Sequence, residues 1–519
     1  MPYKNRKSSY TNFILIFVLI KMGLNLLAIS NFGFHRDELL HLALGDHLDW
    51  GYKEVPPLIA VLAKLTTTLF GNSVFAARIF TTLCSGLIIW LTGKITVELG
   101  GRKFAIALAC LAVTFSPAFT ASGYLFQPVV FDQLWWVLTV WLLLRYINTH
   151  AVKYLYFIGV AIGFGVLTKY TMLFFAGALI LGLIISKQRR LLWNKHVLGA
   201  MGLTILIILP NLIWQFMHHW PVFTHMVTLQ KEQLDYISYS DFIMQELMVN
   251  GVALFVWVIG FFFLIFSFKL RKYQSLAIAF VLIFLFLLQM NGKNYYLFGA
   301  FPMLFAAGGY GFERWIKSNT SLRVAAIMAC TLPNLLIFPT VLPVLPLKPT
   351  LSFFDFINNH THFINFITVW GGDHQHHATT QDYADMFGWE ELTQKVAKAY
   401  YDLTPEQRKN TQIYADNYGE AGALHHFANR YHLPEVISLS SSFALWAPDN
   451  LDGRYIIYVD DENGEKMKRF APITDTCTKL SEITDTLAVE RRSAILLLVN
   501  PKPALNDVYK KELAKKRAQ

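Results

Sequence analysis

The chain has 519 residues, of which 54% are hydrophobic and 15% are charged. A soluble domain has about 25% charged residues, so this composition excludes an ordinary water-soluble protein. The net charge of +10 at pH 7 does not indicate nucleic-acid binding, because the lysines and arginines stand in short clusters between long apolar runs.

In chain order, the predicted elements are about eleven membrane spans followed by a soluble segment. About 20 apolar residues in a helix cross a bilayer core of about 30 Å. Apolar runs predict spans near residues 11–30, 74–98, 103–122, 124–146, 153–167, 169–186, 196–217, 248–268, 274–290, 295–312 and 322–345. With the N-terminus in the cytoplasm, the basic clusters between these spans are all cytoplasmic, which agrees with the positive-inside rule.

This topology places a second group of polar residues on the opposite, non-cytoplasmic side of the membrane. The group consists of the loop 31–73, Asp132, Lys169 with Tyr170, the loop 218–247 and Lys293. Ionisable groups close to the hydrocarbon are costly and usually functional. We therefore expect one functional site on that side.

The first outer loop, residues 31–73, contains two adjacent acids, Asp37 and Glu38. Residues 39–43 predict a short amphipathic helix on the membrane surface, and Pro56-Pro57 starts another helix. A partly desolvated carboxylate has a raised pKa, which makes it a better base near neutral pH. The alternative is structural: Asp37 caps the short helix and Glu38 pairs with Arg36.

Several motifs of the chain follow one family pattern. In the first loop these are Asp37-Glu38, Asp49-Trp50-Gly51-Tyr52 and Pro56-Pro57; later in the chain they are Leu167-Thr168-Lys169-Tyr170 and Gly292-Lys293-Asn294-Tyr295-Tyr296. The pattern resembles the polyprenyl-phosphate-dependent membrane glycosyltransferases of family 39, which include protein O-mannosyltransferases and lipid A aminoarabinose transferases. Asp382–Trp389 and Asn417–Ala423 resemble a bacterial branch of that family.

The resemblance implies a GT-C fold and transfer of a sugar from a polyprenyl phosphate, with inversion at the anomeric carbon, on the non-cytoplasmic side. A hydroxyl acceptor loses its proton as it attacks, so a carboxylate base is needed. By resemblance, Asp37 is this base and Glu38 orients it. Asp132 matches a second acid of the family, which holds acceptor or sugar hydroxyls.

The leaving phosphate gains negative charge during transfer, and preorganised cations lower that barrier. Lys169 and Lys293, within motifs that also contain Tyr170 and Tyr295, are the candidates for this role, with Arg36 and His35 behind them. The alternative is that the two lysines extend from the ends of spans to the lipid headgroups.

The chain departs from the aminoarabinose-type relatives at one position of the first loop. Those relatives have a lysine immediately before the proline, where this chain has Val55, and Lys53 stands two residues earlier. The phosphate-binding pattern is therefore expected to differ, with Lys53 as a further candidate. Glu54 matches an acid that meets a metal ion in some relatives; one acid makes no metal site, so a divalent metal stays an open alternative to no cofactor.

The C-terminal segment predicts a small α/β domain. Strands are expected at residues 411–415, 454–459 and 494–499, with a helix at 420–430. The fold class is thus a mainly α, polytopic membrane protein with a soluble α/β domain. The expected division is residues 1–349 for the transmembrane catalytic domain and 350–519 for the soluble domain, which lies on the non-cytoplasmic side.

The expected function is an inverting glycosyltransferase of the bacterial inner (plasma) membrane. Its partners are a polyprenyl-phosphate-linked sugar donor, membrane lipids, and a lipid, glycan or protein acceptor with a hydroxyl group, without nucleic acid. The alternative is a transporter or flippase for such lipids. Transporters usually have internal repeats and mid-membrane ionisable groups, whereas here the ionisable groups gather on one side.

Overall fold

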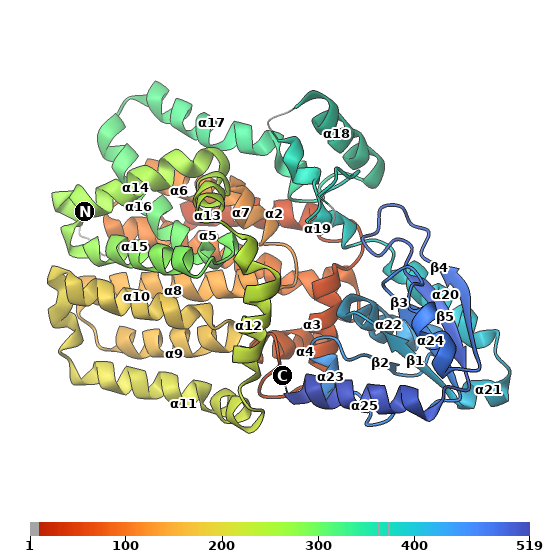
Figure 1. Cartoon of the computed structure of the whole chain (residues 1–519). Coiled ribbons are helices and arrows are strands. Elements are labelled where there is room, and N and C mark those ends of the chain that lie inside the picture. Colours follow the sequence, from red (N-terminus) through yellow and green to blue (C-terminus); the bar gives the residue numbers. More distant parts are fainter. Residues whose placement is uncertain (1–9, 362–363, 372–373, 519) are drawn as a thin grey trace.

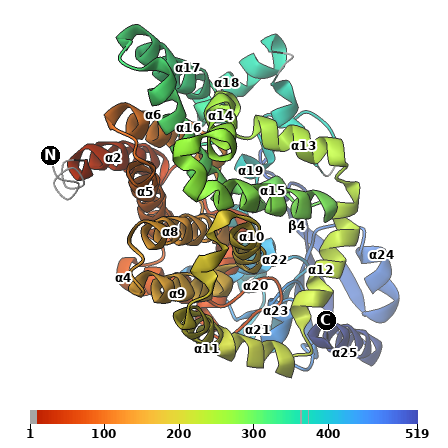
Figure 2. The same cartoon turned by 90° about the vertical axis from the view of Figure 1, so that its left-hand side faces the viewer.

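The computed structural model describes residues 10–361, 364–371 and 374–518. Figure 1 shows a bundle of roughly parallel helices on one side and a smaller α/β domain on the other. The helices of the bundle are seen nearly end-on in Figure 2. The chain is therefore a mainly helical membrane protein with a C-terminal α/β domain.

The predicted spans correspond to apolar helices of unequal length. Within the described residues, five stretches are long and apolar enough to cross a membrane, namely α2 (Thr11–Ala28), α5 (Val74–Leu99), α8 (Pro128–Thr149), α11 (Lys195–Met217) and the run Phe268–Gln289, which contains η4 (Phe268–Tyr273) and α15 (Gln274–Gln289). The other expected spans contain shorter helices: α6 (Lys103–Phe115), α9 (Lys153–Thr168), α10 (Thr171–Ile185), α14 (Leu254–Phe266), α16 (Phe301–Ile316) and α17 (Thr320–Leu336). Several spans are therefore shorter than the apolar runs that predict them.

Glycine allows two of these helices to pack closely. An added Cβ on Gly260 of α14 would lie 1.9 Å from the carbonyl oxygen of Leu304, and one on Gly308 of α16 would lie 2.0 Å from that of Val256. Helices in membranes associate through such small residues, because lipid supplies no hydrophobic driving force between them. Substitution at either glycine would force α14 and α16 apart.

The first outer loop contains a helix that is covered by protein on both faces, which the sequence did not predict. Its helix α3 (Arg36–Asp46) is buried on nearly all sides, between α4 (Leu58–Phe70) and α22 (Tyr418–Tyr431) of the C-terminal domain. A Cβ on Gly422 of α22 would lie 2.9 Å from Cβ of Leu39, so the two helices touch closely. The sequence predicted a helix with only one buried face. The other face is covered by α22, which lies far away in the chain.

The expected outer loop 218–247 is also mostly helical. It forms α12 (Pro221–Glu232) and α13 (Tyr239–Met248), and the segment from Gly251 to the end of α14 continues from α13 at an angle of 94°. This bend makes α13 and α14 a broken span or a re-entrant segment. Both α12 and α13 border the cavity described below.

The C-terminal domain contains a mixed sheet with the strand order β2-β1-β3-β5-β4 in the described part of the chain. Strands β1 (Thr411–Ala415), β3 (Tyr455–Asp460) and β5 (Ala494–Val499) and helix α22 lie where the sequence predicted them. The sequence reading missed β2 (Val436–Ile437) and β4 (Thr476–Glu482). Strands β2, β1 and β3 are parallel, and β5 is antiparallel to both β3 and β4. Further helices of this segment are α18 (Leu347–His360), α20 (Trp389–Tyr401), α23 (Phe443–Trp446) and α25 (Pro503–Ala518).

Candidate active site

The site is built around the first turn of α3. Its N-cap is His35, whose Nδ1 accepts a hydrogen bond from the backbone N–H of Asp37 at 3.1 Å. The carboxylate of Glu38 accepts the backbone N–H of His35 at 2.9 Å, which completes a capping box. The cap fixes the backbone at Asp37, and the helix N-terminus favours negative charge there.

Glu38 is fully buried. Its two oxygens accept hydrogen bonds from Nε and Nη2 of Arg78 at 2.8 and 2.7 Å, and Oε1 also accepts the backbone N–H of Phe126 at 2.8 Å. The alternative drawn from the sequence was that Asp37 caps the helix and Glu38 pairs with Arg36. Both parts are wrong, because the N-cap is His35 and Glu38 pairs with Arg78. The described hydrogen bonds of Glu38 go to Arg78 and to the backbone of His35 and Phe126, and none of them reaches Asp37.

Asp37 is half-buried and faces the cavity. Its Oδ1 accepts a hydrogen bond from the Tyr418 hydroxyl at 2.9 Å, and its Oδ2 accepts one from Nε2 of Gln127 at 3.0 Å. Burial acts to raise the pKa of Asp37, but His35, His41 and Arg36 and the Tyr418 hydrogen bond together lower that pKa below its usual value. The expected raised pKa is thus wrong, since the neighbouring positive charges outweigh desolvation. Asp37 is ionised at neutral pH and can accept a proton.

A cavity of about 2550 Å³ opens beside Asp37, between the helical bundle and the C-terminal domain. Its polar wall includes seven of the residues proposed from the sequence or its resemblance: His35, Arg36, Asp37, Lys169, Tyr170, Lys293 and Tyr295. Glu54 also lines it, whereas Glu38, Asp132 and Lys53 do not belong to the described lining. Another part of the wall is apolar and includes Met226, Leu229, Phe174, Phe286, Leu287 and Met290.

Two lysines converge in this cavity on one tyrosine. Nζ of Lys169 lies 4.5 Å from the ring centres of Tyr295 and Tyr296, and Nζ of Lys293 lies 5.8 Å from that of Tyr295. Burial lowers the pKa of Lys293, and the charge of Asp37 partly opposes this shift. The faces of the rings stabilise the ammonium groups, so positive charge is held close to Asp37.

Asp132 supports this region from inside α8. Its Oδ1 accepts Nε1–H of Trp136 at 3.0 Å, and its Oδ2 accepts the hydroxyl of Thr171 at 2.8 Å. The side chain is buried, and its charge acts on Lys169. On the other side of Lys169, Tyr170 donates its hydroxyl to Oδ1 of Asn211 at 3.0 Å. Asp132 is therefore placed to hold the turn that carries Lys169.

Lys53 and Glu54 face different surroundings. Nζ of Lys53 donates to the backbone oxygen of Lys516 at 2.6 Å, so this lysine anchors α25. The carboxylate of Glu54 accepts the backbone N–H and the hydroxyl of Ser442 at 3.2 and 2.5 Å. Glu54 shares the cavity wall with His225, and their charges interact. Among the described residues, Glu54 belongs to no group of three or more closely spaced metal-ligand side chains.

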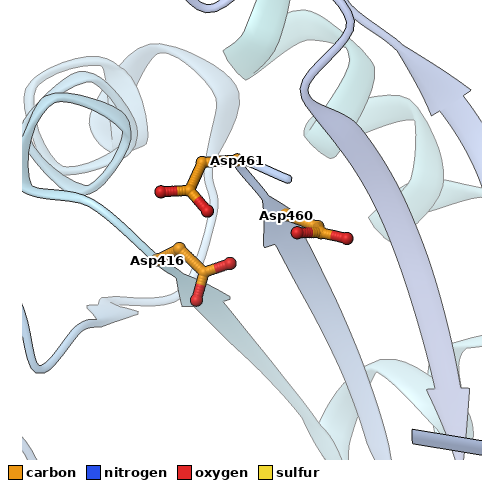
Figure 3. A group of neighbouring side chains, drawn as sticks. All are labelled: Asp416, Asp460 and Asp461. Carbon is orange, nitrogen blue, oxygen red and sulfur yellow. The ribbon is translucent and has the colours of Figure 1, made fainter. Parts of the chain in front are cut away.

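One such group lies in the C-terminal domain, where the carboxylates of Asp416, Asp460 and Asp461 come within 4.8 Å of one another (Figure 3). They stand at the ends of β1 and β3. Nζ of Lys466 lies 2.7 Å from Oδ2 of Asp416 and 3.0 Å from Oδ1 of Asp461. Carboxylates in this arrangement could bind a metal ion, but in the structure the Lys466 ammonium already neutralises part of their charge.

Among the cavity residues that escaped the site prediction are Gln127, His225, Asp385 and Tyr418. Tyr418 and Asp385 stand in the two C-terminal motifs that carry the family resemblance, and those motifs could have pointed to them as site residues. Gln127 and His225 carry no motif. Their positions follow only from how distant helices pack.

Residues 54–214 match the family model described as dolichyl-phosphate-mannose-protein mannosyltransferase. None of the curated proteins matches the sequence. The fold is similar to crystal structures of ArnT from Cupriavidus metallidurans, bound to undecaprenyl phosphate (TM-score 0.61) and in the apo state (TM-score 0.60), each with 13% identity and covering 94% of this chain and 98% of that chain.

These findings favour an enzyme over a lipid transporter. The match covers the segment that begins in the first outer loop and contains Lys169 and Tyr170. The structural likeness covers both the helical bundle and the C-terminal domain. Residues 54–214 thus match the model of the dolichyl-phosphate-mannose-protein mannosyltransferase family, and the chain as a whole has an ArnT-like GT-C fold.

Proposed function

We propose that the protein transfers a sugar, with inversion at the anomeric carbon, from a polyprenyl phosphate to a hydroxyl acceptor, with Asp37 as the general base. The observation that carries the proposal is the position of the ionised Asp37 carboxylate at the wall of a large cavity that also contains Lys169 and Lys293. A base and cations in one cavity are what attack by a hydroxyl and departure of a phosphate require.

The proposed reaction gives the side chains at the cavity wall distinct roles. The acceptor oxygen forms a bond to the anomeric carbon while its proton passes to the Asp37 carboxylate. The bond from that carbon to the phosphate oxygen breaks, and the oxygen leaves with the electron pair. The phosphate thereby becomes a monoester with more negative charge, which Lys169 and Lys293 stabilise. Arg36 and His35 stand behind Asp37 and lower its pKa, which keeps the base ionised.

The apolar wall of the cavity fits the lipid part of the donor. Phe174 lies on α10, Phe286, Leu287 and Met290 lie on or just after α15, and Met226 and Leu229 lie on α12. A polyprenyl chain can stay in contact with these side chains while its phosphate reaches the lysines. The ArnT structure of similar fold was solved bound to undecaprenyl phosphate, and we propose a carrier of the same chemical class here.

A lysine substitution tests the proposed phosphate contact. Replacing Lys293 by methionine keeps the length of the side chain and removes its charge. We expect kcat to fall about 100-fold, because a preorganised cation at the developing phosphate charge is lost. The measurement is steady-state transfer of a radiolabelled sugar from the polyprenyl phosphate.

The matched control for this variant is Lys64→Met, because Lys64 is about half exposed, pairs with Asp46 and lies outside the described cavity lining. Its kcat should stay near the wild-type value. If Lys293→Met keeps kcat within about threefold of the wild type, Lys293 does not contact the leaving phosphate.

We further propose that the site and the C-terminal domain face the non-cytoplasmic side of a bacterial inner membrane. The basic segments η1 (Lys187–Leu192) and η4 lie at the end of the bundle opposite the C-terminal domain (Figure 1). Positive clusters of this kind mark the cytoplasmic side. The contact between Asp37 and Tyr418 supports this proposal, because it joins the proposed site to that domain.

Cysteine labelling tests this orientation. Lys398 on α20 is exposed, and Lys398→Cys in a Cys477→Ser background introduces a reactive thiol into the C-terminal domain. A membrane-impermeant maleimide should label this cysteine in intact spheroplasts, and the Cys477→Ser parent should stay unlabelled. Labelling that appears only after lysis would reverse the proposed topology.

The enzyme proposal itself is tested with purified protein, a polyprenyl-phosphate sugar and hydroxyl acceptors. We expect release of polyprenyl phosphate that depends on the acceptor, and a product with the opposite anomeric configuration. A product that retains the donor configuration would exclude direct displacement assisted by a single base.

A further inference from the structure

The C-terminal domain reaches into the site through Tyr418. This residue is the first of α22, and its hydroxyl donates to Oδ1 of Asp37 across 381 positions of the chain. Tyr418 also belongs to the wall of the cavity. Because Gln127 donates to the other oxygen, the Asp37 carboxylate is held from two sides by neutral donors.

The backbone of Tyr418 is itself held firmly. The side chain of Asn417 caps α22 by accepting the backbone N–H groups of Gly419 and Glu420 at 2.9 and 3.0 Å. The close contact of Gly422 with Leu39 presses α22 against α3, the helix that begins with Arg36 and Asp37. The distance between the phenol and the carboxylate is therefore set by two capped helices in contact.

Arg36 adds a second link between the domain and the site. Its guanidinium lies 4.6 Å from the ring centre of Tyr418 and within 3.7 and 3.9 Å of carboxylate oxygens of Asp385 and Glu490. All three partners belong to the C-terminal segment. The aromatic ring is thus fixed between Arg36 and Asp37, which leaves its hydroxyl little freedom to turn away.

We propose that Tyr418 is a positioning residue for Asp37, so that the C-terminal domain completes the catalytic site. This inference rests on the proposed role of Asp37 as the base. The phenol holds the carboxylate toward the cavity, where the acceptor hydroxyl approaches. When Asp37 takes the acceptor proton, Tyr418 keeps its own proton and its hydrogen bond.

The protonation of Tyr418 is consistent with this role. Burial and the neighbouring Asp37 raise the pKa of its phenol above the ordinary value, so it remains a donor throughout the working pH range. Its hydrogen bond favours the ionised carboxylate and contributes to the lowered pKa of Asp37. Removing the hydroxyl should therefore raise the pKa of Asp37 and loosen the carboxylate.

The test is Tyr418→Phe, which keeps the ring and its contact with Arg36 and removes only the hydroxyl. We expect kcat to fall about tenfold at pH 7.5 because the base is less well placed, while the KM for the donor stays unchanged. In the profile of kcat/KM against pH, the loss on the acidic side should begin at a higher pH than in the wild type. The matched control is Tyr431→Phe on the same helix, whose hydroxyl contacts Glu390 at the surface.

A double variant separates positioning from other roles. In an Asp37→Asn background, Tyr418→Phe should cause no further loss, because the base that Tyr418 positions is already gone. An additional loss there, or an unshifted acidic limb in the single variant, would overturn the inference. If Asp37→Asn itself kept full activity, the proposed function would fail first. An inactive Asp37→Asn with a wild-type-like Tyr418→Phe would refute the role of Tyr418 alone.

Discussion

Replacement of Asp37 by asparagine is expected to reduce sugar transfer by about 10³-fold or more. The amide is nearly the same size and can still receive the hydrogen bond from Tyr418, but it cannot accept the acceptor proton. Loss of a general base typically costs 10²–10⁴-fold, and the ionised state of Asp37 implied by its lowered pKa makes it the available base. The measurement is the rate of transfer from a labelled polyprenyl-phosphate sugar at saturating acceptor.

Two controls keep this result interpretable. Asp46→Asn alters a carboxylate on the same helix that is about half exposed and pairs with Lys64 outside the described cavity lining; its rate should be close to the wild-type rate. The affinity of Asp37→Asn for polyprenyl phosphate should also be unchanged, since the lysines remain. A transfer rate for Asp37→Asn within about tenfold of the wild type would remove the assignment of the base.

The pH dependence of the wild-type enzyme follows from the ionisation of Asp37. The folded-state pKa of Asp37 lies below its ordinary value, so the carboxylate is ionised above that pKa and becomes protonated as the pH falls through it. The contribution of Asp37 to kcat/KM is therefore complete at neutral pH and is lost only on strong acidification.

The second large effect concerns stability. We expect Arg78→Met to destabilise the protein by about 3–5 kcal/mol, because it leaves the carboxylate of Glu38 buried without its partner. Both side chains are fully buried, and two hydrogen bonds of 2.8 and 2.7 Å join them. The measurement is the midpoint of thermal unfolding in detergent, which should fall by several degrees.

An exposed ion pair provides the comparison for Arg78. Lys64→Met breaks a pair whose side chains are about half exposed, and such pairs contribute about 0–1 kcal/mol. Adding Glu38→Gln to Arg78→Met should recover part of the loss, because the unpaired charge disappears. If Arg78→Met unfolded at the wild-type temperature, Glu38 would need another source of charge compensation.

Asp37 and Glu38 show how far the sequence alone could go at the site. The motif singled out both acids, and the apolar pattern of residues 39–43 was enough to predict a helix beginning next to them. Their different environments follow from packing: Glu38 meets Arg78 of α5 and Asp37 meets Tyr418 of α22. These contacts span 40 and 381 positions of the chain, so no local pattern reports them. The pKa of Asp37 was expected to move in the wrong direction because the expectation counted burial and left out the nearby His35, His41 and Arg36, which lower this pKa.

What the sequence determined by itself was the membrane character, the order of the apolar helices and the three strands β1, β3 and β5. Each depends on the local period and length of apolar residues, because a helix in lipid satisfies its own backbone hydrogen bonds. Only the tertiary structure decided that α3 is buried, that Lys53 anchors α25, and that Lys169, Lys293 and Asp37 share one cavity. The physical reason is that burial, charge pairing and cavity shape depend on residues from distant parts of the chain. Folding alone brings those residues together.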